Sequence, residues 1–143
     1  MGRPDYYGNP AGLTDDAATV RAIYDAFARR DIAGMLAHLA PDCELYLRGT
    51  AEIAGREEPY VGAEGLREYF ADVEAIWDEL VLYADDYRVL PGVVIVLGHV
   101  LGRRGDQTAR RFVMWTWRLS DGKATSVRVA DAGELREDHP SVT

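Results

Sequence analysis

The sequence predicts an α+β domain in which helices pack on one face of a strongly curved mixed or antiparallel sheet. Three observations support this class. Two amphipathic helical segments come first, a third helical segment follows an irregular loop, and strand-like segments then run without a break from Val81 to Asp131. Helices followed by a β meander are typical of α+β folds. A sheet curved in this way and covered by helices is expected to enclose a pocket.

Composition narrows the possible classes of protein. The 143 residues are enough for one domain with a core. A net charge of -8 disfavours binding to nucleic acid and to anionic membranes, because both need concentrated Lys and Arg. The single cysteine, Cys43, excludes an internal disulfide and a multi-cysteine metal site. No apolar run approaches the ~20 residues of a spanning helix, and no signal peptide is recognisable, so we expect a cytoplasmic protein.

The expected boundaries are an N-terminal tail over residues 1–13, a domain over 14–135 and a C-terminal tail over 136–143. In the first helix, Thr14 or Asp15 is a candidate N-cap and the end lies near Arg30. Its apolar stripe consists of Val20, Ile23, Tyr24 and Phe27. Asp31 can cap a short second helix, which Pro41 ends.

The middle of the chain is expected to hold one strand, one loop and a third helix. The strand runs from Cys43 to Arg48, and the charged loop from Gly49 to Gly62 is a candidate rim or lid of the pocket. The third helix is predicted over 63–80. Its apolar face carries Leu66, Phe70, Val73, Trp77 and Leu80.

Four antiparallel strands are expected in the second half of the chain, over 81–90, 93–104, 108–119 and 123–131. Turns are predicted at Pro91-Gly92, Gly105-Asp106 and Asp121-Gly122, and such short links join antiparallel neighbours. No repeat, low-complexity tract or second domain is recognisable.

Alternation along these strands predicts which side chains face the helices. In 112–119 the odd positions are all apolar and should face inward: Val113, Trp115, Trp117 and Leu119. The same parity continues through Val127 and Val129 to Asp131, a carboxylate that is placed either at the open end or inside the cavity. In 81–90 the odd positions include Asp85, which is a second carboxylate in line with apolar side chains.

The segment from Val93 to Leu101 is apolar on both faces, so its outer face should also be covered. Gly98 and Gly102 interrupt it and allow the strand to bend. Together with Phe112 and Met114, the outer face is a candidate homodimer interface. The alternative is that a helix or a tail of the same chain covers it.

Several segments resemble SnoaL-like proteins of the nuclear transport factor 2 and ketosteroid isomerase superfamily. The segment from Val20 to Ile32 (VRAIYDAFARRDI) is similar to their first helix, and Ala40 to Glu44 (APDCE) fits the entry to their first strand. Glu58 to Phe70 (EPYVGAEGLREYF) resembles the loop and third helix of stand-alone bacterial members. The closing hairpin is similar in WTWRLSDGK, from Trp115 to Lys123, and in Val127-Arg128.

The resemblance implies a cone-shaped α+β barrel that takes a small, mostly apolar molecule and needs no cofactor. It does not imply ketosteroid isomerase activity, because the catalytic positions of that enzyme fall on Ile23, Leu47 and Trp115. Polyketide cyclases of the SnoaL type use a carboxylate on the last strand. That position falls near Val129, and Asp131 is two residues further on with the same parity.

Three residues are candidates for acid–base chemistry. A carboxylate at Asp131 beside Trp115 and Trp117 would be desolvated, which raises a carboxyl pKa towards a useful range. The alternative is a solvated carboxylate at the rim of the sheet. Asp85 could be its partner, although Asp85-Asp86 also fits a bulge, and the hydroxyl of Tyr24 could reach a ligand or bond within the core.

The expected pocket lies between the helices and the odd face of the sheet. Its predicted lining is Tyr24, Phe27, Leu45, Leu47, Phe70, Trp77, Val96, Val113, Trp115, Trp117, Val129 and Asp131. His38, His99 and His139 lack metal-ligand spacing, so no metal site is expected. Cys43 is expected to be a buried, inert thiol.

Three classes of function fit these observations. The first is a binding or sensing module for a cyclic or polyketide-like small molecule. The second is a cofactor-free isomerase, cyclase or hydratase that uses Asp131 as acid or base. The third is a non-catalytic dimeric interaction module.

Overall fold

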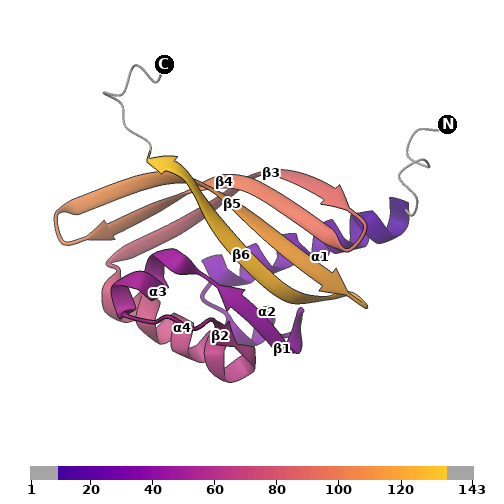
Figure 1. Ribbon diagram of the computed structural model, residues 1–143, viewed down its shortest axis with the longest axis horizontal. Coiled ribbons are helices and arrows are strands. Elements are labelled where there is room, and N and C mark those ends of the chain that lie inside the picture. Colours follow the sequence, from indigo (N-terminus) through magenta and orange to yellow (C-terminus); the bar gives the residue numbers. More distant parts are fainter. Residues whose placement is uncertain (1–9, 135–143) are drawn as a thin grey trace, which may run out of the picture.

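The computed structural model describes residues 10–134, in which four helices lie on one face of a six-stranded mixed sheet (Figure 1). The helices are α1 (Pro10–Ala28), α2 (Ile32–Leu36), α3 (Arg48–Ala54) and α4 (Gly62–Ile76). The strands are β1 (Leu39–Tyr46), β2 (Tyr60–Val61), β3 (Glu79–Leu90), β4 (Val93–Arg104), β5 (Gln107–Ser120) and β6 (Lys123–Glu134). The predicted α+β class is therefore confirmed.

The strand order is β2-β1-β6-β5-β4-β3. All neighbours are antiparallel except β1 and β6, which are parallel. The edge strands β2 and β3 do not pair with each other, so the curved sheet is open. Asp121 and Gly122 both have positive φ, as a tight two-residue hairpin turn requires. Most of both predicted tails lies outside the described residues, and the domain boundaries stay a prediction.

The charged segment after β1 was expected to be a loop, and the structure corrects this. Residues 48–54 form helix α3, in which Arg48 and Glu52 pair one turn apart at 2.8 Å. Gly55 ends the helix in the left-handed conformation, with φ of 78°. Such i,i+4 pairs and terminal glycines favour a helix, although Gly49 and the short length hide it in the sequence.

Several predicted boundaries are also displaced, among them that of β1, which begins at Leu39 rather than at Cys43. Helix α1 starts at Pro10 rather than at Thr14, because proline is well tolerated in the first turn of a helix. Helix α4 ends at Ile76 rather than near Leu80, because the backbone N–H of Asp78 already donates to the carbonyl of Arg103 on β4. Leu80, predicted on the helix, therefore belongs to β3 and is buried there.

The predicted inward face is right for β5 and wrong for the first half of β3. Val113, Trp115, Trp117 and Leu119 are all buried. On β3 the pairing register with β4 shifts between Ala84 and Asp86, which marks a bulge at Asp85. Because an extra residue reverses the alternation, Leu80 and Leu82 face inward before the bulge and Tyr87 after it. Asp85 itself is exposed on the outer face.

Glycine at position 98 permits the close approach of two strands beside this bulge. A Cβ atom built there would lie 1.8 Å from the carbonyl oxygen of Tyr83 and 3.2 Å from the ring of Trp115. Gly102 is equally confined, because its Cβ would lie 2.6 Å from the ring of Trp77. No helix in the described part of the chain is long and apolar enough to cross a membrane.

We predict that Gly98→Ala lowers the free energy of unfolding by about 2–3 kcal/mol, because the methyl group forces backbone movement in a packed region. Urea denaturation of the purified protein measures this change. Gly49→Ala is the matched control, since a Cβ at Gly49 meets nothing within 4 Å. An unchanged midpoint for Gly98→Ala would contradict the close approach of β3 and β4.

Candidate functional site

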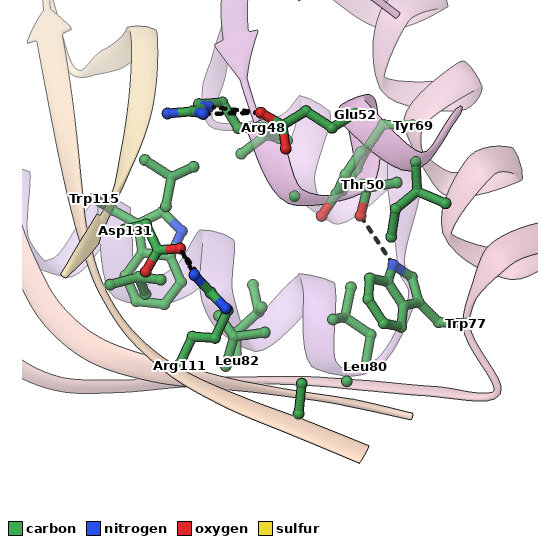
Figure 2. Close-up of a pocket in the computed structure, with 18 residues that line it drawn as sticks. Arg48, Thr50, Glu52, Tyr69, Trp77, Leu80, Leu82, Arg111, Trp115 and Asp131 are labelled. Carbon is green, nitrogen blue, oxygen red and sulfur yellow. Dashed lines mark hydrogen bonds and ion pairs between the residues drawn. The ribbon is translucent and has the colours of Figure 1, made fainter. Parts of the chain in front are cut away.

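A pocket of about 420 Å³ opens between α3, α4 and the inner face of β3 to β6 (Figure 2). Its walls are mostly apolar. The lining consists of Leu47, Arg48, Gly49, Thr50, Glu52, Ile53, Tyr69, Trp77, Leu80, Leu82, Val100, Gly102, Ala109, Arg111, Val113, Trp115, Val129 and Asp131. These residues come from segments far apart in the sequence, so the folded domain is needed to assemble the site.

Five of the eleven predicted apolar lining residues lie in the wall of this pocket. Leu47, Trp77, Val113, Trp115 and Val129 line the pocket. The residues that do not line this pocket are Tyr24, Phe27, Leu45, Phe70, Val96 and Trp117. They belong to the core or pack against it. Alternation identifies the inner face of a strand, but it does not tell how far along the strand the helices fill that face.

Tyr24 illustrates this difference. Its ring lies edge-on to Trp115 and Trp117, with centroids 5.2 Å and 5.8 Å away. Its hydroxyl oxygen accepts a hydrogen bond of 3.0 Å from Nε1 of Trp117. Burial raises the pKa of Tyr24 well above its ordinary value. Tyr24 therefore holds Trp115, which lines the pocket, in place. Its own phenol is neutral and belongs to the core.

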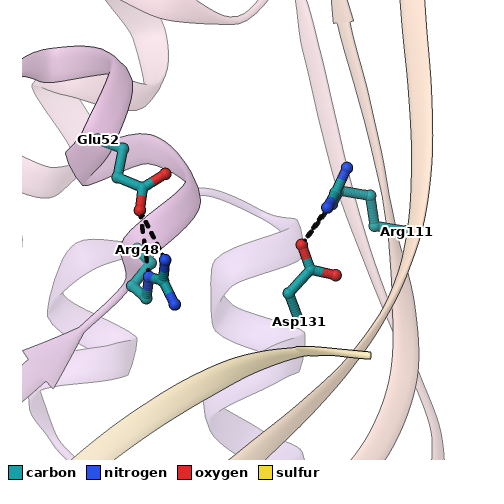
Figure 3. Close-up of polar contacts among 4 residues, drawn as sticks. All are labelled: Arg48, Glu52, Arg111 and Asp131. Atoms are coloured by element: carbon teal, nitrogen blue, oxygen red, sulfur yellow. Dashed lines mark hydrogen bonds and ion pairs between the residues drawn. The ribbon is translucent and has the colours of Figure 1, made fainter. Parts of the chain in front are cut away.

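The mouth of the pocket carries two ion pairs from different parts of the chain (Figure 3). On the sheet side, Nε of Arg111 on β5 donates a hydrogen bond of 2.6 Å to Asp131 on β6. On the helix side, Arg48 donates to Glu52 at 2.8 Å. Hydrogen bonding to Glu52, the charge of Glu52 and the charge of Asp131 raise the pKa of Arg48, and desolvation opposes this.

Asp131 therefore lines the pocket, as its parity predicted, and lies at the solvated mouth rather than deep inside. Its side chain is 39% exposed and that of Arg111 is 47% exposed. The carboxylate has the guanidinium of Arg111 beside it. Its role as acid or base stays a prediction.

The inner end of the pocket holds a different polar group. Nε1 of Trp77, just after α4, donates a hydrogen bond of 3.0 Å to Oγ1 of Thr50 on α3. Thr50 is only 4% exposed. Burial raises the pKa of Tyr69 on α4 to about 12, and a hydrogen bond from Thr50 partly offsets this. The pocket is thus neutral and buried at one end and charged and solvated at the other.

The remaining candidates lie away from the pocket. Asp85 is on the outer face of the sheet, where it lies 2.8 Å from Nδ1 of His99. The same His99 ring stacks on Tyr83 at 4.3 Å. Cys43 is fully buried, and burial raises the pKa of its thiol to about 12. Within residues 10–134, no group of three or more His, Cys, Asp or Glu side chains could hold a metal ion.

Sequence reasoning missed five polar lining residues, of which only Tyr69 and Arg111 carried a signal; the others are Arg48, Thr50 and Glu52. Arg111 has the same parity as Val113 and Trp115, so extending the alternation towards the start of β5 would have found it. Tyr69 is three positions after Leu66 on the helical stripe of α4. Arg48 and Glu52 depend on α3, which was expected to be a loop.

The comparisons with known proteins agree with this architecture. The sequence model of the SnoaL-like domain matches residues 20–127. No curated protein matches the chain. An NTF2-like protein of unknown function from Burkholderia pseudomallei is 25% identical, with 82% of this chain and 90% of that chain covered and a TM-score of 0.74.

Two further solved structures are similar. TerC, co-crystallised with polyporic acid, is 26% identical, with 82% of this chain and 91% of that chain covered and a TM-score of 0.74. A proposed polyketide cyclase from Silicibacter sp. TM1040 is 19% identical, with coverage of 83% and 90% and a TM-score of 0.69, and it shares the fold. Since the family model spans most of the described residues and the neighbours share this arrangement of helices and sheet, the chain belongs to the SnoaL-like domain family.

Proposed function

We propose that the protein binds a small, mostly apolar cyclic or polyketide-like molecule in the pocket between α3, α4 and the sheet. The observation that carries this proposal is a cavity of about 420 Å³ with apolar walls and few polar groups. Small-molecule sites in proteins have this character, with volumes of roughly 300–1,000 Å³. The co-crystallisation of TerC with polyporic acid supports the proposal by similarity.

The walls offer aromatic and aliphatic surface to such a ligand. Trp115 and Trp77 are lining aromatic residues that can stack on a ring. Leu80, Leu82 and Val100 complete an aliphatic wall. The charges at the mouth sum to zero over Arg48, Glu52, Arg111 and Asp131, so the site makes no strong demand for a charged ligand.

The second candidate function is cofactor-free proton transfer by Asp131. The observation that favours it is the position of this carboxylate in the pocket lining, held by Arg111 at 2.6 Å. A positioned carboxylate can take a proton from an acidic C–H of a bound ligand. The other two predicted members of this chemistry, Tyr24 and Asp85, do not line the pocket and take no part in this candidate.

A homodimer through the outer face of the sheet is a further part of the proposal. Tyr83, His99 and Phe112 are cross-strand partners on β3, β4 and β5, so they form a row on one face. Phe112 is 48% exposed, Tyr83 39% and Leu97 37%. Exposed apolar side chains grouped on one face favour an interface between protein surfaces.

We predict that Ala109→Trp weakens the binding of the neutral dye Nile red by at least about tenfold, because filling the pocket costs a bound ligand more than ~1.4 kcal/mol. Ala109 lines the pocket and is exposed, so the variant should fold. Dye fluorescence measures the affinity. The matched control is Thr108→Trp, at a neighbouring exposed position outside the lining, and equal binding by both variants would contradict the proposed site.

For the proton-transfer candidate, the wild-type protein is expected to accelerate exchange in D2O of the methyl protons of 2-methyl-1,4-naphthoquinone, whose conjugated bonds link the methyl group to the carbonyl oxygen across the ring. Asp131→Asn should lower this rate by ~10²–10⁴, the range for loss of a general base. Proton NMR follows the exchange, and Glu52→Gln removes the other lining carboxylate as a control. Exchange at the rate of buffer alone would leave binding as the function.

The homodimer is tested by Phe112→Glu, which places a charge in the proposed interface. We expect the molar mass from light scattering to fall from that of two chains to that of one. Val61→Glu is the control, because Val61 is 45% exposed on the edge strand β2 at the other side of the sheet. A monomeric wild-type protein would rule out the interface.

A further inference from the structure

The inner end of the pocket contains a chain of three hydrogen-bonding groups from α3 and α4. Trp77 donates from Nε1 to Oγ1 of Thr50 at 3.0 Å, and the hydroxyl of Thr50 lies beside that of Tyr69, whose pKa its hydrogen bonding lowers. Among the residues whose burial is described, Thr50 is the single buried polar or charged one outside the tyrosines and tryptophans of the core. Figure 2 shows the hydroxyl groups of Thr50 and Tyr69 beside the indole of Trp77, away from Arg111 and Asp131.

A count of protons in this chain leaves one donor over. An indole N–H can only donate, whereas each hydroxyl carries one proton and can also accept. Since Oγ1 of Thr50 accepts from Trp77, its own proton is available for the oxygen of Tyr69. The bond from Thr50 lowers the pKa of Tyr69, as a bond donated to the phenol oxygen does, so the proton of Tyr69 remains, and it has no acceptor among the side chains that the structure describes.

The surroundings make this remaining donor significant. The pocket that it faces has mostly apolar walls, which include Leu80, Leu82 and Val100, and Tyr69 is only 6% exposed. A ligand that fills the pocket without offering an acceptor would leave this donor buried and unpaired, which is unfavourable. Because burial raises the pKa of Tyr69 to about 12, the phenol is neutral at physiological pH and acts as a donor rather than a base.

The two ends of the pocket therefore differ in what they can recognise. At the mouth, each arginine already faces a carboxylate of the protein, Glu52 or Asp131. At the inner end, the tyrosine proton has no such match in the described part of the chain. The hydroxyl of Tyr69 is therefore a neutral hydrogen-bond donor that needs an acceptor, and a ligand can supply one with an oxygen atom.

We propose that Tyr69 donates its hydroxyl proton to a carbonyl oxygen at the buried end of the ligand, with Thr50 and Trp77 as positioning residues. This inference rests on the proposed binding function and names the ligand class within it. The ligand is an apolar ring compound with a ketone or quinone oxygen on the end that enters first. Tyr69 thereby sets both the orientation and the chemical preference of the site.

The test uses a matched pair of probes, 9-fluorenone and fluorene, which differ in one carbonyl oxygen. We expect Tyr69→Phe to weaken binding of 9-fluorenone by roughly two- to tenfold, the effect of one neutral hydrogen bond. The affinity for fluorene should not fall. Titrations followed by the indole N–H signals of a ¹⁵N-labelled protein give both affinities, because Trp77 and Trp115 line the pocket.

Two further measurements separate hydrogen bonding from a general effect on structure. The carbonyl stretch of bound 9-fluorenone should lie at lower wavenumber in the wild-type protein than in Tyr69→Phe. Thr50→Val should move the Trp77 indole signal and weaken 9-fluorenone but not fluorene. Tyr46→Phe is the control, because the hydroxyl of Tyr46 bonds to Glu44 outside this pocket.

The outcomes distinguish this inference from the proposed function. If both probes perturb the signals of Trp77 and Trp115 but respond equally to Tyr69→Phe, the carbonyl site is wrong and the binding pocket stands. If the carbonyl stretch is the same in both proteins, the inference is likewise overturned. If neither probe perturbs these signals at saturation, the proposed function fails and the inference fails with it.

Discussion

The contact between helix α1 and strand β5 determines where this domain can have a pocket. Tyr24 on α1 lies edge-on to both Trp115 and Trp117 and accepts a hydrogen bond from Trp117 across 93 positions of sequence. Large aromatic side chains contribute much of the buried area of a core, and a buried indole N–H needs an acceptor. This contact therefore fixes the helix against the sheet and fills one half of its inner face.

Trp115 lies at the boundary between the filled and the open half. Tyr24 packs against it in the core, and the same indole is part of the pocket lining. Further towards the start of β5, Val113, Arg111 and Ala109 continue the inner face and line the pocket. The change from core to cavity thus occurs along a single strand, without any change in its alternation.

The order of elements, the hairpin turns and the inner face of β5 could be predicted from the sequence, because each depends on local patterns. The Asp121-Gly122 turn is an example, since both residues take the positive φ that this pair tolerates. The bulge at Asp85 could not be predicted from alternation, and it reversed the expected face of Leu82. The depth of the pocket depends on how far α1 and α3 reach over the sheet, which is a property of tertiary packing.

The site residues show the same difference between features that local patterns predict and features that tertiary packing determines. Asp131 was found because it continues a regular alternation into the pocket. Arg48 and Glu52 were missed because the sequence does not show that α3 is a helix. The two side chains of this ion pair are 67% and 63% exposed. Exposed pairs of this kind stabilise a protein by at most ~1 kcal/mol, so stability alone does not explain why α3 places them at the mouth.

The two ends of the pocket limit which chemistry it can support. Figure 2 shows Tyr69 and Asp131 at opposite sides of the space. A carbonyl held by Tyr69 would acidify the C–H bonds next to it, but Asp131 is at the other end of the ligand. A base there could use that activation only if conjugated bonds carried the charge along the molecule to the carbonyl oxygen.

This separation distinguishes the two candidate functions by the kind of ligand each requires. A simple aromatic ketone would be oriented by Tyr69 and bound without reaction, because its acidic C–H bonds lie far from the carboxylate. An extended conjugated polycarbonyl compound could span both ends, with one oxygen on Tyr69 and a distant C–H bond at Asp131. The same arrangement of residues therefore favours binding for short ligands and permits proton transfer only for long, conjugated ones.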